Sequence, residues 1–192
     1  MVAKYVFLGL DANFAINVET QVPEIVSYLK DGPAFWRNTG SHHPFVLDTY
    51  SGSGGLYHEN FKLIEFKPTE AGQVSFIELI EKPTTGRNKL TDKDLCQSHI
   101  NRLRDIFNKG AAKYIFIPPA AIKLLKKKEE FHWLCAAPLR NEGDLIVLSK
   151  NTERGQIVFE MYHLSNYGKY DARLKRQIKQ VKEIVVSERK AV

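Results

Sequence analysis

The sequence predicts an α/β domain with three layers, α/β/α, built on a mostly parallel central sheet. Three short apolar runs, at residues 4–10, 113–117 and 157–162, predict buried strands. Amphipathic stretches separate them, and residues 91–108 form the clearest of these. Strands that alternate with helices along a chain are typical of a parallel sheet covered by helices on both faces.

Turn chemistry and hydrophobic spacing define the elements in the first half of the chain. The pair Gly32-Pro33 and the run Ser51–Gly55 are typical of loops, and Pro23 suits the first turn of a helix. The expected elements are a strand at residues 4–10, a helix at 22–30, a loop at 31–55, a helix at 57–66 and a strand at 73–80.

The second half begins with the best-defined helix, at residues 91–108. Thr91 can cap its N-terminus, and Leu90 and Leu95 occupy the two positions of a hydrophobic staple. The apolar stripe comprises Leu95, Ile100, Leu103, Ile106 and Phe107. The expected elements that follow are a strand at 113–117, a helix from Pro119, short strands within 131–163 and a helix at about 170–186.

Length and composition predict one soluble domain spanning residues 1–192. The chain is 43% hydrophobic and 26% charged, as in ordinary globular proteins. It shows neither an N-terminal signal peptide nor an apolar run near 18 residues, so a cytoplasmic monomer without membrane contact is expected. Its two cysteines are too few for a cysteine-bound iron–sulfur cluster, and we expect no cofactor.

Positive charge gathers near the C-terminus. The net charge is +6, and the stretch from Lys169 to Lys190 holds eight Lys and Arg against three Asp and Glu. A clustered basic patch is typical of proteins that bind a polyanion such as nucleic acid. A solvated helix face accounts for the same pattern.

Polar side chains follow two of the predicted strands, and they are the main candidates for chemistry. Asp11 comes after the first apolar run and His163 after the last. Ligands of open α/β sheets bind outside the carboxyl ends of the strands. A carboxylate and an imidazole about 150 residues apart are therefore expected to share one sheet edge and one cleft.

The motifs around these residues resemble those of the uracil-DNA glycosylase superfamily, nearest its mismatch-specific branch in layout. Each motif is short, but they occur in the family's order and cover almost the whole chain. The similar segments are Gly9–Asn13, Tyr57–Phe61, Ser75–Thr84, the helix Leu90–Phe107 with the strand Tyr114–Ile117, and the closing motif His163–Asn166.

Three positions depart from the family pattern. Ala12 and Leu164 each stand where the family has a proline, so the chain lacks two residues with a pre-set φ angle. Glu78 stands near the place of an amide or another polar base reader. These departures leave the expected fold unchanged and concern the choice of substrate.

The resemblance implies a DNA glycosylase of base-excision repair, acting on a flipped uracil or related damaged base. Such a reaction needs a carboxylate near the sugar and a hydrogen-bond donor to the leaving base. Asp11 is assigned the first role and His163 the second. The alternatives are an aspartate that caps a turn and a structural histidine.

Further residues are assigned to DNA and base recognition. Ser165 and the backbone after it would hold a phosphate, as the family implies, and Tyr167 would fill the gap left by the flipped base. Ordinary turn and surface roles compete with both. The full set comprises Phe14 and Phe45 for stacking, Glu78 for base reading, and Ser165, Asn166, Tyr167 and Lys169 for DNA.

Glu78 bears on specificity. An ionised carboxylate only accepts hydrogen bonds, so it would repel uracil O4 and favour a base with two adjacent donors. Protonation by burial would relax that preference. A solvent-facing Glu78 is the alternative.

Two other functions stay open. One is a DNA- or protein-binding module without catalysis, and the other is a hydrolase of free nucleosides or nucleotides. His42, His43 and His58 lack the spacing of metal sites, so no metal is expected.

Overall fold

The chain divides into two compact units, and each is made of two separate stretches of sequence. The first unit combines Met1–Ala12 with Gln73–His163, and the second combines Asn13–Gly72 with Leu164–Val192. The computed structural model describes residues 3–11, 19, 22–50, 52, 54–82 and 90–191.

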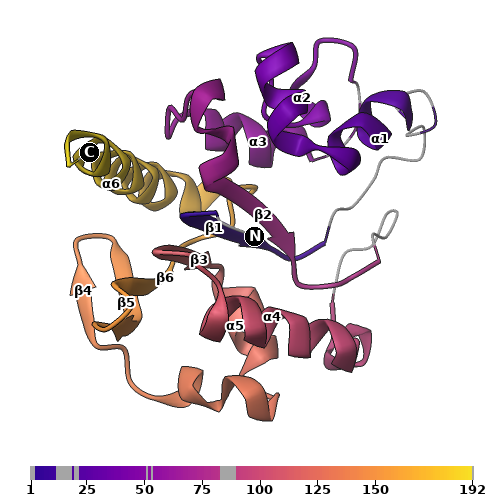
Figure 1. Ribbon diagram of the computed structural model, residues 1–192. Coiled ribbons are helices and arrows are strands. Elements are labelled where there is room, and N and C mark those ends of the chain that lie inside the picture. The colour runs from indigo at the N-terminus through magenta and orange to yellow at the C-terminus, as the bar shows by residue number, and fades with distance from the viewer. Residues whose placement is uncertain are drawn as a thin grey trace. The chain divides into compact units, whose positions relative to one another are not determined.

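The first unit contains a six-stranded, mostly parallel sheet, so the predicted α/β class is confirmed (Figure 1). The strand order is β2-β1-β3-β6-β5-β4. The first four strands in this order are mutually parallel, while β5 is antiparallel to both β6 and β4. The strands are β1 (Tyr5–Gly9), β2 (Val74–Glu78), β3 (Tyr114–Ile117), β4 (Arg140–Glu142), β5 (Leu145–Asn151) and β6 (Gln156–Glu160).

Helices of the first unit pack on one face of this sheet. They are η4 (Asp92–Asp94), α4 (Gln97–Lys109), α5 (Pro119–Leu125) and η5 (Glu129–Cys135). Burial of their apolar side chains stabilises the unit by about 25 cal/mol per Å² of area removed from water. The shared core includes Val6, Leu8, Ile100, Leu103, Phe107, Ile115, Ile117, Ile122, Leu125, Phe131 and Val158.

The opposite face of the sheet carries a ladder of aromatic rings. The Phe7 ring stacks on Phe116 with 4.7 Å between centroids, and Phe116 stacks on Phe159 at 5.6 Å. Phe76 extends the ladder at 6.1 Å from Phe7. The strand register pairs each of these neighbours directly, and such ring pairs contribute about 0.5–1.5 kcal/mol beyond burial. One aromatic per strand therefore ties the four parallel strands together.

The second unit is helical in its described part. The last helix, α6 (Asp171–Lys190), buries the apolar stripe expected from the sequence, and Leu174, Ile178, Val181 and Val185 are each at most 2% exposed. The elements of the unit are α1 (Val22–Lys30), α2 (Gly32–Thr39), η2 (Pro44–Val46), α3 (Gly55–Lys62), η3 (Pro68–Gln73), η6 (Gly168–Tyr170) and α6 (Asp171–Lys190).

The prediction of a loop across residues 31–55 is wrong, because helix α2 occupies its first part. Asp31 caps this helix: its Oδ1 accepts from the backbone N–H of Ala34 at 2.9 Å. Pro33 lies in the first turn, where a missing N–H costs nothing. Gly40 ends the helix with φ of 73° and donates its N–H to the carbonyl of Trp36. The same Gly-Pro chemistry that suggested a loop thus begins a helix.

Replacing Asp31 by Ala is expected to lower the free energy of unfolding by about 1 kcal/mol, because the Ala34 N–H loses its acceptor. Urea unfolding at pH 7 measures the effect. The matched control is Asp48→Ala, at an exposed aspartate outside any helix, which should change stability by a few tenths of a kcal/mol. Equal effects of the two changes would contradict the capping role.

The predicted helix 91–108 is divided in two. Thr91 does form a capping box with Asp94, whose Oδ2 accepts from the Thr91 N–H at 2.7 Å. That box closes only the short turn η4. Leu95 and Cys96 are extended, so α4 begins at Gln97. Among the described residues, no helix is both long enough and apolar enough to cross a membrane.

Candidate active site

Three ionisable side chains lie at the carboxyl-end edge of the parallel strands. Glu78 is the last residue of β2, Asp11 comes two residues after β1, and His163 comes three residues after β6. These strands are parallel, and β3 separates β1 from β6. Two strand spacings make the axes of β1 and β6 about 10 Å apart. Asp11 and His163 therefore follow strands that end at the same edge.

The strand order also identifies a topological switch point at this edge. The chain leaves β1 toward β2 on one side, and it leaves β3 toward β6 on the other. The connections from these two neighbouring strands diverge, and open α/β sheets commonly bind ligands beyond the carboxyl ends of strands at such a point. Asp11 follows directly from β1 and so borders the switch point.

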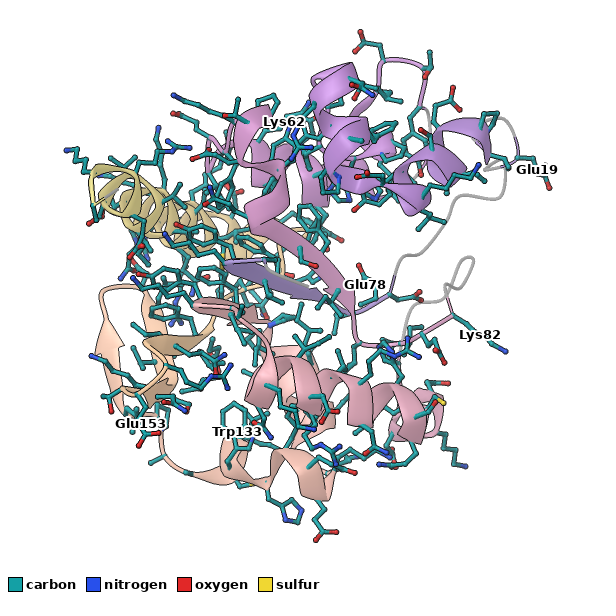
Figure 2. All side chains as sticks on the ribbon, in the orientation of Figure 1. Glu19, Lys62, Glu78, Lys82, Trp133 and Glu153 are labelled. Atoms are coloured by element: carbon teal, nitrogen blue, oxygen red, sulfur yellow. The ribbon has the colours of Figure 1, made fainter. Side chains whose placement is uncertain are left out.

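Glu78 lies over the end of β1. The register pairs it with Gly9, and a Cβ built on Gly9 would be 2.3 Å from the Glu78 Oε2. A side chain at position 9 would therefore require the Glu78 carboxyl group to move. The same Oε2 is buried and has no hydrogen-bond partner among the described residues. A buried, unpartnered carboxyl oxygen is costly and is typical of functional sites. Figure 2 shows Glu78 at the end of β2.

The environment favours the neutral form of Glu78. Burial raises the pKa of the Glu78 carboxyl to about 7, and the negative charge of Asp11 adds to the shift. Near pH 7 the group is therefore present in both protonation states. Carboxyl groups with a raised pKa beside a second carboxylate are typical of acid–base sites.

His99 was not predicted as part of this edge. Its Nε2 lies 2.9 Å from the backbone oxygen of Glu78, so Nε2 carries the hydrogen and donates to that carbonyl. His99 thereby connects α4 to the end of β2. Its Nδ1 is buried without a partner among the described residues. A polar residue four positions before Leu103, on the apolar stripe, was the only sequence signal.

His163 is half-buried and neutral at physiological pH. Burial lowers the pKa of its imidazole to about 4. A neutral ring carries one N–H donor and one acceptor nitrogen, so it can donate a hydrogen bond without first taking up a proton.

At pH values higher than 7, Glu78→Gln is expected to raise the free energy of unfolding, by at most about 3 kcal/mol at pH 8. The folded pKa lies above the unfolded value, so the stability that Glu78 contributes is complete below pH 4.5. It is lost as the pH rises toward 7, because the unfolded chain releases the proton first. Glutamine stays neutral, so the variant should gain at pH 8 and match the wild type near pH 4. Urea unfolding across this range tests it.

The control for this change is Glu129→Gln, at an exposed position. It should leave the pH dependence of unfolding as in the wild type. A Glu78→Gln protein whose stability follows the wild-type curve from pH 4 to pH 8 would show that the carboxyl group is solvated.

The residues assigned to DNA contact lie in the second unit. Tyr167 is 77% exposed. The Lys169 ammonium lies 5.1 Å from the centre of the Tyr170 ring. Ser165 and Asn166 are half-buried in the turn before η6.

The two stacking candidates differ in what the structure describes. Phe45 is buried, and its ring stacks on Tyr50 with 4.5 Å between centroids. A Cβ on Gly54 would approach the Phe45 ring to 2.8 Å, so contacts within the unit surround this ring. Phe14 lies outside the described residues.

The basic C-terminal helix pairs with acidic groups of its own unit. Lys175 bonds to Asp171 at 2.8 Å, and Lys182 bonds to Glu65. Arg189 binds both carboxylate oxygens of Glu70 at 2.6 Å, which lowers the pKa of that carboxyl group. Part of the local positive charge is thus compensated within the second unit.

Three histidines gather in the second unit. His42 Nε2 lies 3.1 Å from His58 Nδ1, and His43 stacks on His58 with 3.7 Å between ring centroids. Burial lowers the pKa of both His42 and His43 to about 3. In the described part of the chain, no three His, Cys, Asp or Glu side chains are arranged to hold a metal ion.

Comparison with known proteins adds no assignment to this site. No protein-family model matches the chain, and no curated protein matches it.

Proposed function

We propose that this protein is a DNA glycosylase that hydrolyses the N-glycosidic bond of a flipped uracil or related base. One observation supports the proposal above the others: a carboxylate, a buried carboxyl group with pKa about 7 and a neutral imidazole share one sheet edge. The family resemblance of the motifs supports it too. Under this proposal the two units form one uracil-DNA glycosylase-like domain with three layers.

Asp11 acts on the sugar. Departure of the base leaves an oxocarbenium-like sugar, whose positive charge a fixed carboxylate stabilises at short range. The same carboxylate orients the water that attacks the anomeric carbon and accepts its proton. Its position beside the β1–β3 switch point supports this role.

His163 acts on the leaving base. Negative charge accumulates on a carbonyl oxygen of the base as the bond breaks, and the imidazole N–H donates to that oxygen. Because the pKa of His163 is about 4, the ring is neutral at pH 7 and serves as a hydrogen-bond donor rather than a strong acid.

Glu78 reads the edge of the base. In its protonated form the carboxyl group presents one donor and one acceptor side by side. That pattern complements a base edge on which a carbonyl adjoins an N–H, such as the O4 and N3–H of uracil. The ionised form offers acceptors only. A pKa near 7 therefore makes the preference for carbonyl-bearing bases depend on pH.

A hydrolase of free nucleosides is the second candidate. The intramolecular pairs of Lys175, Lys182 and Arg189 favour it, since they occupy charge that a DNA backbone would need. The same three edge residues would serve in that reaction.

The direct test uses oligonucleotides that carry uracil, hypoxanthine, xanthine or mismatched thymine. Incubation followed by alkaline cleavage at abasic sites, at pH 6 and pH 8, reveals which base is released. Inosine and uridine are supplied in parallel as free substrates. Abasic sites in one oligonucleotide support the glycosylase. Release from nucleosides alone supports the second candidate, and no release from any substrate refutes both.

DNA binding is expected to weaken steeply with salt. Each neutralised phosphate contributes about −0.9 to the log–log slope on duplex DNA, so a few contacts give a slope of roughly −2 to −4. Fluorescence anisotropy of a labelled duplex between 50 and 200 mM salt measures it. Lys169→Ala should make the slope shallower by about 1, while Lys123→Ala on α5 should not. Binding that is insensitive to salt would argue for the nucleoside hydrolase.

A further inference from the structure

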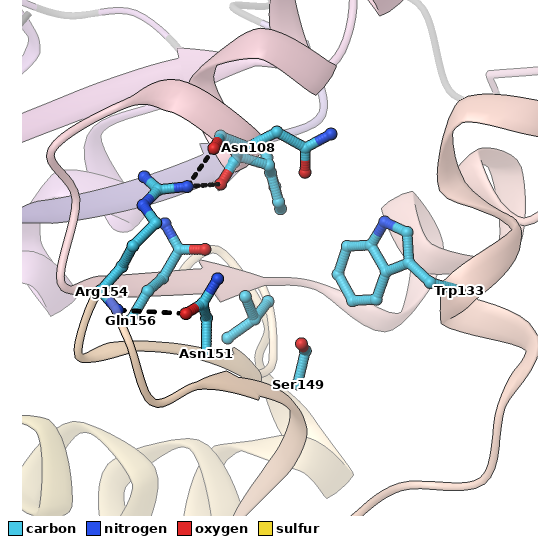
Figure 3. Close-up of a pocket in the computed structure, with 8 residues that line it drawn as sticks. Asn108, Trp133, Ser149, Asn151, Arg154 and Gln156 are labelled. Carbon is cyan, nitrogen blue, oxygen red and sulfur yellow. Dashed lines mark hydrogen bonds between the residues drawn. The ribbon is translucent and has the colours of Figure 1, made fainter.

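A cavity lies in the first unit, at the end of the sheet opposite Asp11 and His163. Its volume is about 300 Å³, near the lower limit of pockets that bind small molecules. It opens among the end of α4, the β5–β6 hairpin and η5 (Figure 3). The lining residues are Phe107, Asn108, Trp133, Ser149, Asn151, Arg154, Gln156 and Val158.

A β-bulge in β5 turns side chains into this cavity. Val147 pairs with Phe159, whereas Ser149 pairs with the preceding residue Val158, so one extra residue is inserted in β5. In a regular strand, residues 147 and 149 would share a face. The bulge instead places Ser149 on the face of Val158, which packs in the α4 core. Bulges that re-aim side chains are common beside binding sites.

The cavity wall presents hydrogen-bonding groups that the protein leaves open. Gln156 is buried, and its Nε2–H group donates a hydrogen bond to the backbone carbonyl of Ala112 at 3.0 Å. The Gln156 Oε1 is therefore left as an acceptor. The Asn151 Oδ1 accepts a hydrogen bond from the backbone N–H of Arg154. The side-chain amide hydrogens of Asn151 are therefore left as donors. Among the described residues, no hydrogen bond occupies the Ser149 hydroxyl.

The remaining walls are aromatic and uncharged, apart from one guanidinium. The Trp133 and Phe107 rings lie 6.3 Å apart, and Figure 3 shows Trp133 across the cavity from Asn151 and Gln156. Arg154 donates to the carbonyls of Asn108 and Gly110 at the end of α4, where the helix dipole is negative. None of the described lining residues carries a carboxylate.

We propose that this cavity binds a neutral planar heterocycle of nucleobase size. Its ring lies against the Trp133–Phe107 wall, and its edge meets the donors of Asn151 and Ser149 and the acceptor of Gln156. The face of a flat ring packs against the apolar wall. Hydrogen-bond acceptors and donors at the ring's edge pair with the polar side chains opposite. The ligand carries no positive charge, because no described carboxylate faces it.

This site is separate from the edge that holds Asp11. Gln156 begins β6, whereas His163 follows its end. Five residues at about 3.3 Å each put the two edges about 16 Å apart. A ligand in this cavity therefore does not contact Asp11, and the proposal does not depend on glycosylase activity.

The test uses hypoxanthine as the probe. The chain has two tryptophans, so Trp36→Phe leaves Trp133 as the sole reporter, and calorimetry on the protein with Trp36 intact avoids reliance on that variant. Saturable quenching and heat are expected, with Kd between roughly 10 µM and 1 mM. Indole, which lacks the acceptor groups, should bind at least 10-fold more weakly.

Three variants locate the binding. Ser149→Leu fills the cavity and should weaken binding at least 10-fold. Thr152→Leu, at an exposed position on the same hairpin, should leave Kd within twofold, and so should Asp11→Asn. The proposal is overturned if hypoxanthine does not bind, if Ser149→Leu binds as the wild type does, or if Asp11→Asn abolishes binding, since that would place the ligand at the other edge.

Discussion

Asp11→Asn and His163→Ala are each expected to reduce turnover on the preferred base by roughly 10²–10⁴. Under the proposed mechanism, the first change removes the charge that stabilises the oxocarbenium-like sugar, and the second removes the donor to the leaving base. Neither interaction is needed before the bond begins to break, so the loss should appear in kcat with little change in KM. Single-turnover release of the base from a labelled oligonucleotide measures it.

Asp105→Asn is the matched control for Asp11→Asn. Asp105 lies on α4 in the same unit, where its half-exposed side chain pairs with Arg104 and Lys109. This variant should retain wild-type turnover. Wild-type rates in Asp11→Asn or in His163→Ala would remove the corresponding residue from the mechanism, provided that circular dichroism shows both variants folded.

Acidification from pH 7 to pH 5 is expected to lower the free energy of unfolding by roughly 4 kcal/mol through His42 and His43 together. Both have a pKa of about 3 in the folded chain, against about 6.5 when unfolded. The unfolded state therefore binds protons first. The stability that neutral histidines contribute is complete above pH 6.5 and is lost as the pH falls toward 3.

Contacts around the histidines explain the cost of a proton there. His42 lies against the rings of Trp36 and Phe61 and bonds to His58, which His43 covers. A charge placed among these rings loses its hydration and meets a second imidazole. Glu78 titrates in the opposite sense and His163 in the same sense, so urea unfolding in the Glu78→Gln, His163→Ala background isolates the effect of His42 and His43.

In that background His42→Phe should roughly halve the pH dependence, because one of the two remaining histidines with a lowered pKa is gone. The control is His132→Gln, which alters an exposed histidine of the first unit and should leave the dependence unchanged. Equal stability at pH 7 and pH 5 in the Glu78→Gln, His163→Ala background would mean that the cluster opens to solvent before it is protonated.

The strands and the C-terminal helix could be predicted from the sequence, because their hydrophobic periods are local. Residues 4–10 gave β1, and the stripe through Leu174 and Val185 gave α6, although α6 continues to Lys190. Asp11 follows β1 and His163 follows β6. Because these strands are parallel, both residues lie at the same edge of the sheet. Hydrophobic periodicity therefore predicted the parallel strands and the edge of the sheet at which Asp11 and His163 follow them.

Other features depend on pairing that no local pattern encodes. The Gly32-Pro33 pair is compatible with a loop or with a helix start, and the Asp31 cap decides between them. The bulge beside Ser149 exists only relative to β6. The raised pKa of Glu78 arises from its position over Gly9 and near Asp11. These features could therefore be identified only from the three-dimensional structure.

The discontinuous make-up of the second unit has a consequence for synthesis on the ribosome. Its first stretch ends at Gly72, and its second begins at Leu164. The bonds that join the two stretches are formed late, since Asn60 donates to the Leu164 carbonyl and Arg189 binds Glu70, across 104 and 119 residues. All strands of the sheet have been translated by then, whereas the helices α1 to α3 cannot complete their packing until α6 has been synthesised. Nascent chains stalled before residue 164 should therefore expose this helical half to proteases and chaperones.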